Sequence, residues 1–255
     1  MQADKITLSL VSHGQAALCA SLLADLAVLA PSSVHKLVFT INIPEQLPQL
    51  PQLPFPVELI RNARPLGFGA NHNQAFARCA SAYFAVLNPD LRLQQDPFPP
   101  LIARLADPKV GLVAPLVLEV DGRVADFARR MVSPWEVIRR RIVAPDGGAG
   151  MDQPDWVAGM FLVFRSETFS SLAGFDTRYT LYCEDVDLCA RLRLRGLRLE
   201  VVREVSVTHL AQRASRRSLP RMLMHGSSLL KLWSSPVYRN YQLLLRKEAA
   251  EHGEI

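Results

Sequence analysis

The sequence predicts an α/β fold in which a mostly parallel central sheet is flanked by helices and followed by a helical C-terminal segment. The first 90 residues alternate strand-like and helix-like patterns, which is typical of a parallel sheet with helices on its faces. Apolar, strand-like runs return at 110–119, 156–164 and 199–209. From Leu219 onward the apolar residues recur at helical spacing, so the chain is expected to end in helices.

Four strands and two helices are expected in the first part of the chain. The proline-rich stretch 47–56 is predicted to be an extended connection, because proline lacks the backbone donor that helices and inner strands use. In parallel sheets the ligand binds beyond the carboxyl ends of the strands, so the residues just past those ends are candidate site residues. The strands are predicted over 6–11, 36–42, 57–61 and 83–88, and the helices over 15–30 and 71–80.

The second part of the chain is expected to be less regular. Strands are predicted over 110–119, 156–164 and 199–209, and a helix over 184–195 that Gly196 stops. Residues 123–150 contain many turn-forming residues and are predicted to form a loop over the site.

The composition is that of an ordinary globular protein. Of 255 residues, 49% are hydrophobic and 21% are charged. The four cysteines form no C-x-x-C pair, so reduced thiols are expected. No signal-peptide pattern opens the chain, and no apolar run reaches the roughly 18 residues of a membrane span. A cytoplasmic protein is therefore expected.

The net charge of +5 is concentrated in two arginine clusters, at 139–141 and at 213–221. Such clusters suit nucleic acid, anionic lipid or a phosphorylated substrate, and they also occur on plain solvated surfaces. The clusters lack interleaved aromatic residues, and the chain contains no recognised nucleic-acid-binding module. A nucleic-acid partner is therefore not expected.

Polar residues follow several of the predicted strands. Ser12 follows the first strand, Asn42 the second and Asn88-Pro89-Asp90 the fourth, while His209 ends the last one. The Asp90 carboxylate is a hard oxygen ligand that can hold Mg²⁺ or Mn²⁺ against a diphosphate. Asn-Pro-Asp is also common turn chemistry, and a lone histidine is often structural, so a plain turn and a packed side chain are the alternatives.

Gly67 and Gly69 lie just before the predicted helix 71–80. Glycines at such a position permit close approach of the backbone to a ligand, and helix N-termini attract anions. A capped loop without a ligand is the alternative. The segment lacks the third glycine of a dinucleotide-binding fingerprint and comes too late in the fold, so that interpretation is rejected.

Three carboxylates stand together at the start of the predicted helix 184–195, in Glu184-Asp185-Val186-Asp187. The helix dipole favours ionised acids there, which is one explanation for them. Asp187 and Arg191 are four residues apart and are expected to pair. This leaves Glu184 and Asp185 to face a site, where an ionised carboxylate is a suitable general base toward a hydroxyl group.

The order of these features resembles the family 2 glycosyltransferases of the GT-A fold, in particular the bacterial rhamnosyltransferase-type branch that builds cell-surface polysaccharides. The resemblance covers residues 6–217. Its most specific part is Gly174-Phe175-Asp176 followed by the acidic cluster at 184–187 and Arg191. Four segments carry it, namely 62–73, 87–90, 156–165 and 174–191, with His209 following.

The resemblance implies an inverting, metal-dependent sugar transfer from a nucleotide diphosphate. Asp90 would bind Mg²⁺ or Mn²⁺, with Asn88 in the first position of a D-x-D-type motif, and His209 would add a further ligand. Asp185 would be the catalytic base that takes the proton of the acceptor hydroxyl. Glu184 would help to orient the acceptor.

The resemblance also implies binding roles for residues at the strand ends and loops. Asn42 stands where the family often has an aspartate that reads the nucleotide base, and its amide can still pair with a pyrimidine edge. The nucleotide would lie along Ser12, Asn42, Gly67, Gly69 and Asn71, and the donor sugar and acceptor would lie near Trp156 and Gly159.

The implied organisation is a glycosyltransferase domain over 1–218 with a helical extension at 219–255. Within the domain, the nucleotide-binding half would be 1–120 and the acceptor-binding half 121–218. The implied partners are a TDP- or UDP-linked sugar, such as rhamnose, and a saccharide acceptor linked to polyprenyl diphosphate. The extension mixes apolar and basic residues, so it is expected either to pack on the domain or to lie at the inner face of the membrane.

Two other functions stay open at this point. A degenerate, non-catalytic protein that binds a nucleotide sugar or a carbohydrate is compatible with Asn88 in place of a carboxylate, while the intact Glu184-Asp185 pair argues against it. A sugar nucleotidyltransferase would need a glycine-rich loop with a basic residue after the first strand, which Ser12-His13-Gly14-Gln15 does not supply.

Overall fold

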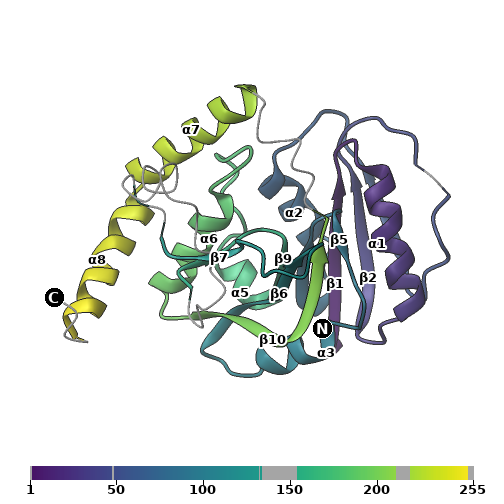
Figure 1. Ribbon diagram of the computed structural model, residues 1–255, viewed down its shortest axis with the longest axis horizontal. Helices are drawn as coiled ribbons and strands as arrows, with labels where there is room; N and C mark the ends of the chain where they lie inside the picture. The colour runs from purple at the N-terminus through teal and green to yellow at the C-terminus, as the bar shows by residue number, and fades with distance from the viewer. Residues whose placement is uncertain (1, 48, 132, 134–153, 211–218, 252–255) are drawn as a thin grey trace.

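Eight strands form one sheet to which both halves of the chain contribute (Figure 1). The computed structural model describes residues 2–47, 49–131, 133, 154–210 and 219–251. The strand order is β3-β2-β1-β4-β9-β6-β10-β5, so β9 from the second half lies between β4 and β6. In chain order these strands are β1 (Gln2–Ser12), β2 (Val34–Ile41), β3 (Val57–Arg61), β4 (Ser81–Leu87), β5 (Leu91–Arg92), β6 (Val110–Glu119), β9 (Phe161–Arg165) and β10 (Arg198–His209).

The sheet is mostly parallel, as predicted. β1 pairs in parallel with β2 and β4, β2 pairs in parallel with β3, and β6 pairs in parallel with β10. β9 is antiparallel to both β4 and β6, and β5 is antiparallel to β10. The carboxyl ends of the parallel strands therefore meet at one edge, and the beginning of β9 lies at that same edge because Phe161 is opposite Leu87. This edge is where a ligand is expected.

Helices surround the sheet, and a small two-stranded ribbon packs beside it. The ribbon consists of β7 (Ala128–Arg129) and β8 (Trp156–Val157), and β8 contacts α6. The last two helices lie along one side of the molecule, where α8 packs on α6 (Figure 1). The helices are α1 (Ala16–Leu29), α2 (Phe68–Phe76), α3 (Phe98–Arg104), α5 (Ser166–Ser171), α6 (Glu184–Leu194), α7 (Leu219–Ser234) and α8 (Pro236–Glu251).

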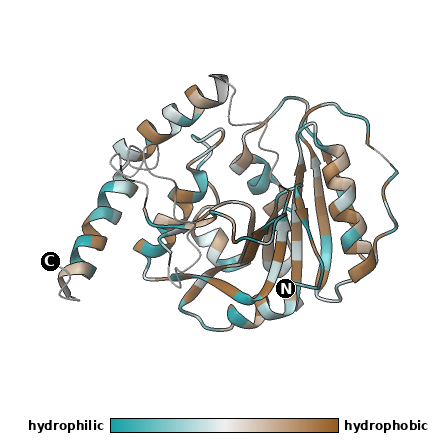
Figure 2. Cartoon of the chain, viewed as in Figure 1, coloured by the Kyte–Doolittle hydropathy of each residue, from teal (hydrophilic) through white to brown (hydrophobic). Residues whose placement is uncertain are grey.

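The hydrophobic core lies against both faces of the sheet, which is why its central strands are apolar almost throughout. Leu8 and Leu10 of β1 are fully buried, and Figure 2 shows the brown segments along the central strands. Phe169 of α5 contacts the rings of Phe84 and Phe164, with centroids 5.1 Å apart in both pairs. These aromatic contacts join the first and second halves of the chain in one core.

The structure corrects several predicted boundaries. The strand predicted over 156–164 is interrupted at Ala158–Met160, where Met160 N donates to Ala158 O at 2.6 Å and the chain turns. The helix predicted over 71–80 begins at Phe68 and ends at Phe76. The short elements β5, β7, α3 and α5 were not predicted. Elements this short are held by tertiary contacts and leave little periodicity in the sequence.

Two expectations concern residues outside the described ranges. These are the arginines at 139–141 and 213–217, and most of the loop predicted over 123–150. In the part of the chain that the structure describes, none of the helices is both long and apolar enough to cross a bilayer.

Gly174→Ala is expected to destabilise the protein more than Gly196→Ala. Both glycines have a positive φ, 66° and 74°, which costs alanine about 1–2 kcal/mol. At Gly174 a Cβ would also overlap the amide of Asn73, which holds the backbone of Phe175 through hydrogen bonds of 2.8 and 2.9 Å. At Gly196 a Cβ would meet no atom within 4 Å.

We therefore expect urea unfolding to give a loss of about 2–4 kcal/mol for Gly174→Ala and about 1–2 kcal/mol for Gly196→Ala. Equal losses in the two variants would contradict the packing argument.

Candidate active site

A pair of adjacent carboxyl groups, Glu184 and Asp185, begins α6 at the carboxyl edge of the sheet. Asp185 Oδ2 accepts a hydrogen bond from Gly159 N at 3.1 Å, and its Oδ1 accepts one from Val186 N at 2.9 Å. Glu184 is 4% exposed, and its Oε2 atom has no hydrogen-bond partner among the described residues. A buried, unpartnered carboxylate oxygen is a candidate for contact with a substrate.

The two residues that precede this pair have left-handed backbone conformations. Tyr182 has φ 71° and Cys183 has φ 68°, and neither is a glycine. Such conformations cost free energy and persist only where surrounding contacts impose them, which is frequent at functional sites. The third acid of the cluster, Asp187, pairs with Arg191 at 2.7 Å, as predicted from their spacing.

The surroundings of Glu184 and Asp185 raise the pKa of both carboxyl groups. Burial raises the pKa of the Glu184 carboxyl to about 8, and the neighbouring charge of Asp185 adds to this effect. Burial also raises the pKa of Asp185, while two backbone N–H donors and the Arg129 guanidinium act in the opposite direction. The pair therefore titrates as a unit and retains a proton near neutral pH. A carboxylate with a raised pKa is a stronger base toward a hydroxyl proton.

Arg129 is a site residue that the sequence reasoning missed. It lies opposite Trp156 in the β7–β8 ribbon, with its guanidinium 5.0 Å from the centroid of the indole. Its Nε also donates to Asp126 Oδ1 at 2.7 Å. No sequence signal could have found it, because only the pairing of two-residue strands far apart in the chain brings it near Asp185.

Trp156 itself has a different surrounding from the one expected. Its ring is 5% exposed, and its Nε1 donates to Arg130 O at 2.9 Å. The indole therefore supports the ribbon and Arg129, and its place near a sugar stays a prediction. Gly159 lies beside the candidate base, because its N–H donates to Asp185 and a Cβ there would lie 3.0 Å from Phe68 Cζ.

Asp90 and His209 form a second polar pair at the same edge. Leu210 N donates to Asp90 O at 2.7 Å, and Asp90 Oδ2 lies 3.1 Å from His209 Nε2. Burial alone would lower the pKa of His209, but the hydrogen bond and the charge of Asp90 outweigh it, so the pKa is raised. The other two polar atoms, Asp90 Oδ1 and His209 Nδ1, are buried without a hydrogen-bond partner among the described residues.

These two side chains fit a divalent cation. A buried carboxylate oxygen and a ring nitrogen without partners are suited to satisfy such an ion. Within the described ranges, no group of three or more His, Cys, Asp or Glu side chains is arranged to hold a metal. The other ligands of a cation at Asp90 and His209 would therefore come from diphosphate oxygens and water.

The two polar pairs are connected through the backbone where β9 begins. Gly159 N binds Asp185, and the adjacent Met160 O accepts a hydrogen bond from Asn88 N at 2.9 Å. Asn88 is two residues before Asp90, in the predicted first position of the D-x-D-type motif. The candidate base and the candidate metal ligands thus belong to one continuous edge of the sheet.

The two asparagines expected to lie along the nucleotide, Asn42 and Asn71, make hydrogen bonds that shape the protein. Asn42 Oδ1 accepts from Leu66 N at 2.8 Å and from Asn62 Nδ2 at 2.9 Å, while its Nδ2 donates to Leu66 O at 2.9 Å. Asn71 Nδ2 donates to Gly67 O at 2.9 Å. Both Asn42 and Asn71 are nearly fully buried. The Asn42 amide is thus held by contacts within the protein, and its role toward a nucleotide base stays a prediction.

The two glycines before α2 also have a structural explanation. A Cβ at Gly67 would lie 2.6 Å from Thr180 O, and one at Gly69 would lie 2.5 Å from Phe175 Cβ. Close approach of the segment leading into α6 therefore requires glycine at both positions, and their place along a nucleotide stays a prediction. Ser12 is likewise buried, and its Oγ accepts a hydrogen bond from Gln15 N at 3.2 Å within the turn after β1.

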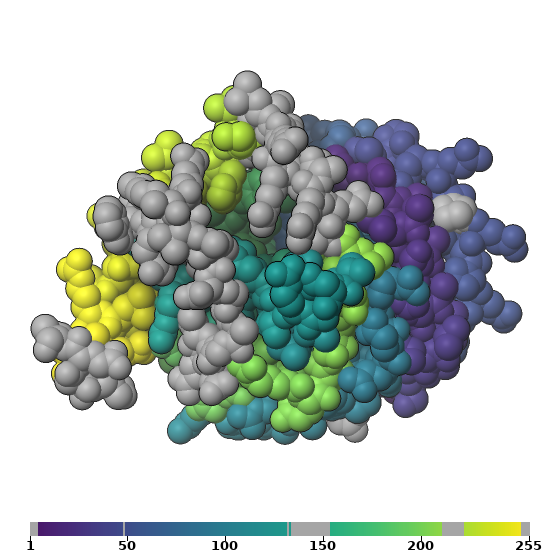
Figure 3. Space-filling model, in the orientation of Figure 1, coloured from purple at the N-terminus to yellow at the C-terminus, as the bar shows by residue number. Residues whose placement is uncertain are grey.

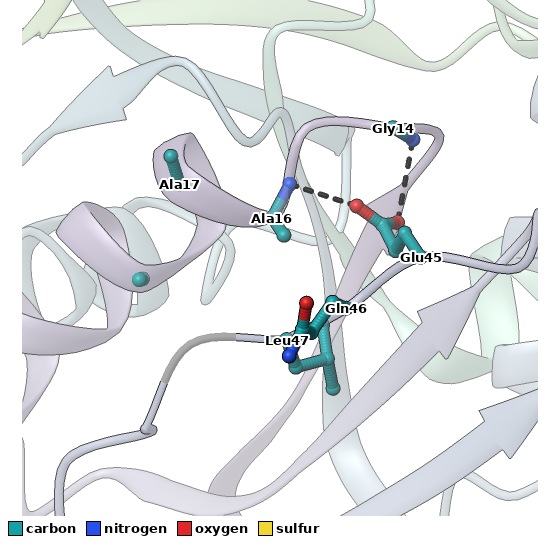
Figure 4. A pocket seen from close by; sticks show the side chains of 7 residues that line it. Gly14, Ala16, Ala17, Glu45, Gln46 and Leu47 are labelled. Carbon is teal, nitrogen blue, oxygen red and sulfur yellow. Dashed lines mark hydrogen bonds between the residues drawn. The ribbon is translucent and has the colours of Figure 1, made fainter.

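An open hollow of about 730 Å³ lies between the loops that follow β1 and β2 (Figure 4). It is lined by the first turns of α1 and by residues 45–47. The Glu45 carboxylate accepts hydrogen bonds from Gly14 N at 3.3 Å and Ala16 N at 2.9 Å. Because this carboxylate already occupies the positive end of α1, the hollow is a poor site for a phosphate. The candidate base Asp185 and the candidate metal ligand Asp90 do not line this hollow.

The fold and this edge define the class of protein. Among solved structures the chain is similar to GalNAc-T7, whose crystal structure contains UDP, GalNAc and Mn²⁺. The TM-score is 0.64 at 14% sequence identity, covering 91% of this chain and 48% of that chain. At this identity the likeness shows the fold alone, which is the predicted GT-A fold.

Sequence comparisons then give the family. The model of "Glycosyl transferase family 2" matches residues 40–164. Rhamnosyltransferase WbbL of Escherichia coli K12 is 28% identical over 166 residues, which are 59% of this chain and 63% of that protein. These matches support the prediction of a family 2 glycosyltransferase that is similar to the rhamnosyltransferases.

A second relative is the N-acetylglucosaminyl-diphospho-decaprenol L-rhamnosyltransferase of Mycobacterium tuberculosis. It is 27% identical over 219 residues, which are 73% of this chain and 70% of that protein. The chain thus spans 63% of the E. coli relative and 70% of the mycobacterial one.

Glu184→Gln is expected to make the stability of the protein less dependent on pH. The folded-state pKa of Glu184 is about 8 against an ordinary value of 4.5, so between these values the folded protein keeps a proton that the unfolded chain releases. The free energy of unfolding therefore falls as pH rises through this window. Glutamine does not ionise and removes this loss.

Thermal unfolding of both proteins across about pH 5 to 9 tests this prediction. We expect the Tm of the variant to rise relative to wild type at alkaline pH by about 2–4 °C per kcal/mol of ionisation cost removed. Glu167→Gln, at an exposed position of α5, is the control and should run parallel to wild type. A Glu184→Gln curve that also runs parallel to wild type would refute the raised pKa.

Proposed function

We propose that this protein transfers a sugar, with inversion, from a nucleotide diphosphate to a hydroxyl group of a saccharide acceptor. The observation that carries the proposal is the buried Glu184–Asp185 pair, which lies on the same edge as Asp90 and His209. A single displacement needs a base on one side of the reacting carbon and stabilisation of the leaving diphosphate on the other. The two pairs are suited to these two tasks.

Asp185 is the proposed catalytic base. Its two oxygens accept N–H donors from Gly159 and Val186, which fix the direction of the carboxylate. The raised pKa of Asp185 strengthens it as a base once the pair has lost its shared proton. Glu184 Oε2 has no partner among the described residues, and it is proposed to accept a hydrogen bond from a second hydroxyl group of the acceptor and so to orient the sugar.

Asp90 and His209 are the proposed holders of Mg²⁺ or Mn²⁺. When bound, such an ion offsets the negative charge of the diphosphate. The buried Asp90 Oδ1 and His209 Nδ1 atoms support this assignment because nothing else among the described residues satisfies them. Asn88 and the turn that it begins would lie beside the diphosphate.

The proposed donor is a TDP- or UDP-linked sugar, with rhamnose favoured by the names of the two relatives. The proposed acceptor is a saccharide on a polyprenyl diphosphate, because the mycobacterial relative is named for such an acceptor. Arg129, held between Asp126 and Trp156, is a candidate to contact an anionic group of donor or acceptor. A lipid-linked acceptor would bring the protein to the inner face of the membrane.

Asp185→Asn is expected to lower kcat by about a hundredfold or more while changing the donor Kd by less than about twofold. The reason is that asparagine cannot take the hydroxyl proton but preserves the shape of the site. Wild-type activity should rise with pH as the pair loses its proton. The measurements are transfer rates and calorimetric donor binding, with Asp121→Asn, at an exposed carboxylate, as control.

NMR of the product formed from an α- or β-linked donor gives the stereochemical outcome. A retained anomeric configuration, or normal turnover by Asp185→Asn, would overturn the assignment of Asp185.

Asp90→Ala is expected to weaken binding of the nucleotide diphosphate by about tenfold or more, and only when Mn²⁺ is present. In EDTA the variant and wild type should bind alike, because the carboxylate acts through the ion. Thermal stabilisation by UDP, TDP and GDP, each with Mn²⁺ or EDTA, measures this and also identifies the preferred nucleotide. Equal loss of binding in Mn²⁺ and in EDTA would contradict a metal-dependent role.

A further inference from the structure

Helix α7 has apolar side chains on two opposite faces. On its inner face Leu229 and Leu232 are buried against the domain. Met222, Leu223 and Leu230 are 55%, 68% and 66% exposed. Positions 223 and 230 are seven residues apart and project from the same side of the helix, so Leu223 and Leu230 form the centre of an outer face, and Met222 lies at its margin. Figure 1 places α7 along the edge of the molecule, and Figure 2 shows its brown segments.

This outer face is unusual for a helix on a water-exposed surface. Of the ten large apolar side chains that are exposed in the described structure, four lie on α7 and a fifth, Leu243, lies on α8. A surface helix normally directs polar residues outward. A group of exposed apolar side chains therefore indicates a surface that something covers. Figure 3 shows the side chains of α7 at the upper left rim of the molecule.

The charge of α7 indicates what covers it. Its 16 residues include Arg221 and Lys231 and no aspartate or glutamate. A helix that combines an apolar face with only basic charges matches a surface that is apolar inside and negatively charged outside. That is the description of an anionic lipid layer. An acidic protein partner fits this face less well, because it would need ion pairs there. Met222, Leu223 and Leu230 have no charge to offer it.

We propose that the outer face of α7, formed by Met222, Leu223 and Leu230, docks on an anionic lipid surface. This inference rests on the proposed function and deepens it, because it names the part of the molecule that meets the membrane of a lipid-linked acceptor.

Contacts made by α7 connect this docking surface to the candidate active site. Ser228 Oγ donates to Leu181 O at 2.8 Å, and Lys231 Nζ donates to Arg178 O at 3.0 Å. The ring of His225 contacts Tyr182, with centroids 4.9 Å apart. α7 thus holds segment 178–183, which contains the two left-handed residues and leads into Glu184 and Asp185. Docking through α7 therefore sets the catalytic pair at a fixed place relative to the lipid surface.

Flotation with vesicles tests the docking directly, without any sugar substrate. The full chain is mixed with vesicles of phosphatidylcholine containing about one third phosphatidylglycerol, and with vesicles of phosphatidylcholine alone. We expect wild type to float with the anionic vesicles and to release as salt rises. Leu223→Gln/Leu230→Gln should weaken this binding by about tenfold or more.

The matched control is Val28→Gln/Val120→Gln, which removes two exposed apolar side chains, 85% and 72% exposed, from other parts of the surface. It should float like wild type. Both double variants are expected to keep the wild-type Tm, because the replaced side chains are exposed. Wild-type flotation by Leu223→Gln/Leu230→Gln, or equal loss in the control, would overturn the proposal.

Three further results test this inference and separate it from the proposed function. If the wild-type chain sediments as a dimer that Leu223→Gln/Leu230→Gln dissociates, the face binds a second copy and the lipid proposal is wrong. If the double variant transfers sugar to a soluble acceptor at the wild-type rate but no longer floats, docking is confirmed as a role separate from catalysis. A wild-type chain that floats but transfers nothing would refute the proposed function alone.

Discussion

The edge of the sheet that carries the candidate active site depends on the backbone at Gly159 and Met160, where β9 enters the sheet. Because β9 runs antiparallel between β4 and β6, its beginning lies where its parallel neighbours end. Gly159 N then reaches Asp185, and Met160 O reaches Asn88 N. These two hydrogen bonds join the acid pair of the second half to the Asn88–Asp90 turn of the first. A side chain at position 159 would press on Phe68, whose Cζ would lie 3.0 Å from the added Cβ.

The free-energy costs of the site are concentrated around α6. Glu184 is buried beside Asp185, and Tyr182 and Cys183 hold left-handed conformations in front of them. Backbone N–H donors and the Arg129 charge offset part of the cost at Asp185. The cost has a chemical consequence, since a carboxyl group that resists ionisation becomes a better base when it does ionise. Contacts from α7 hold the strained segment in place.

Several motif residues to which the resemblance gives a role in ligand binding are also required by packing. Gly67 and Gly69 permit the approach of Thr180 and Phe175, and Asn42 and Asn71 hold the loop at Leu66. All of these contacts shape the edge that carries Asp90 and Asp185.

The sequence by itself determined the features that depend on neighbours along the chain. The strands at 57–61 and 110–119 match their predicted bounds, and Asp187 pairs with Arg191, because periodicity and i,i+4 spacing are local. It also indicated the order of strand-end residues from which the GT-A fold and the family were predicted. Only the tertiary structure decided the antiparallel insertion of β9, the place of Arg129, and the occupied amide of Asn42. Each of these depends on contacts between residues far apart in the chain, which leave no pattern within any one segment of the sequence.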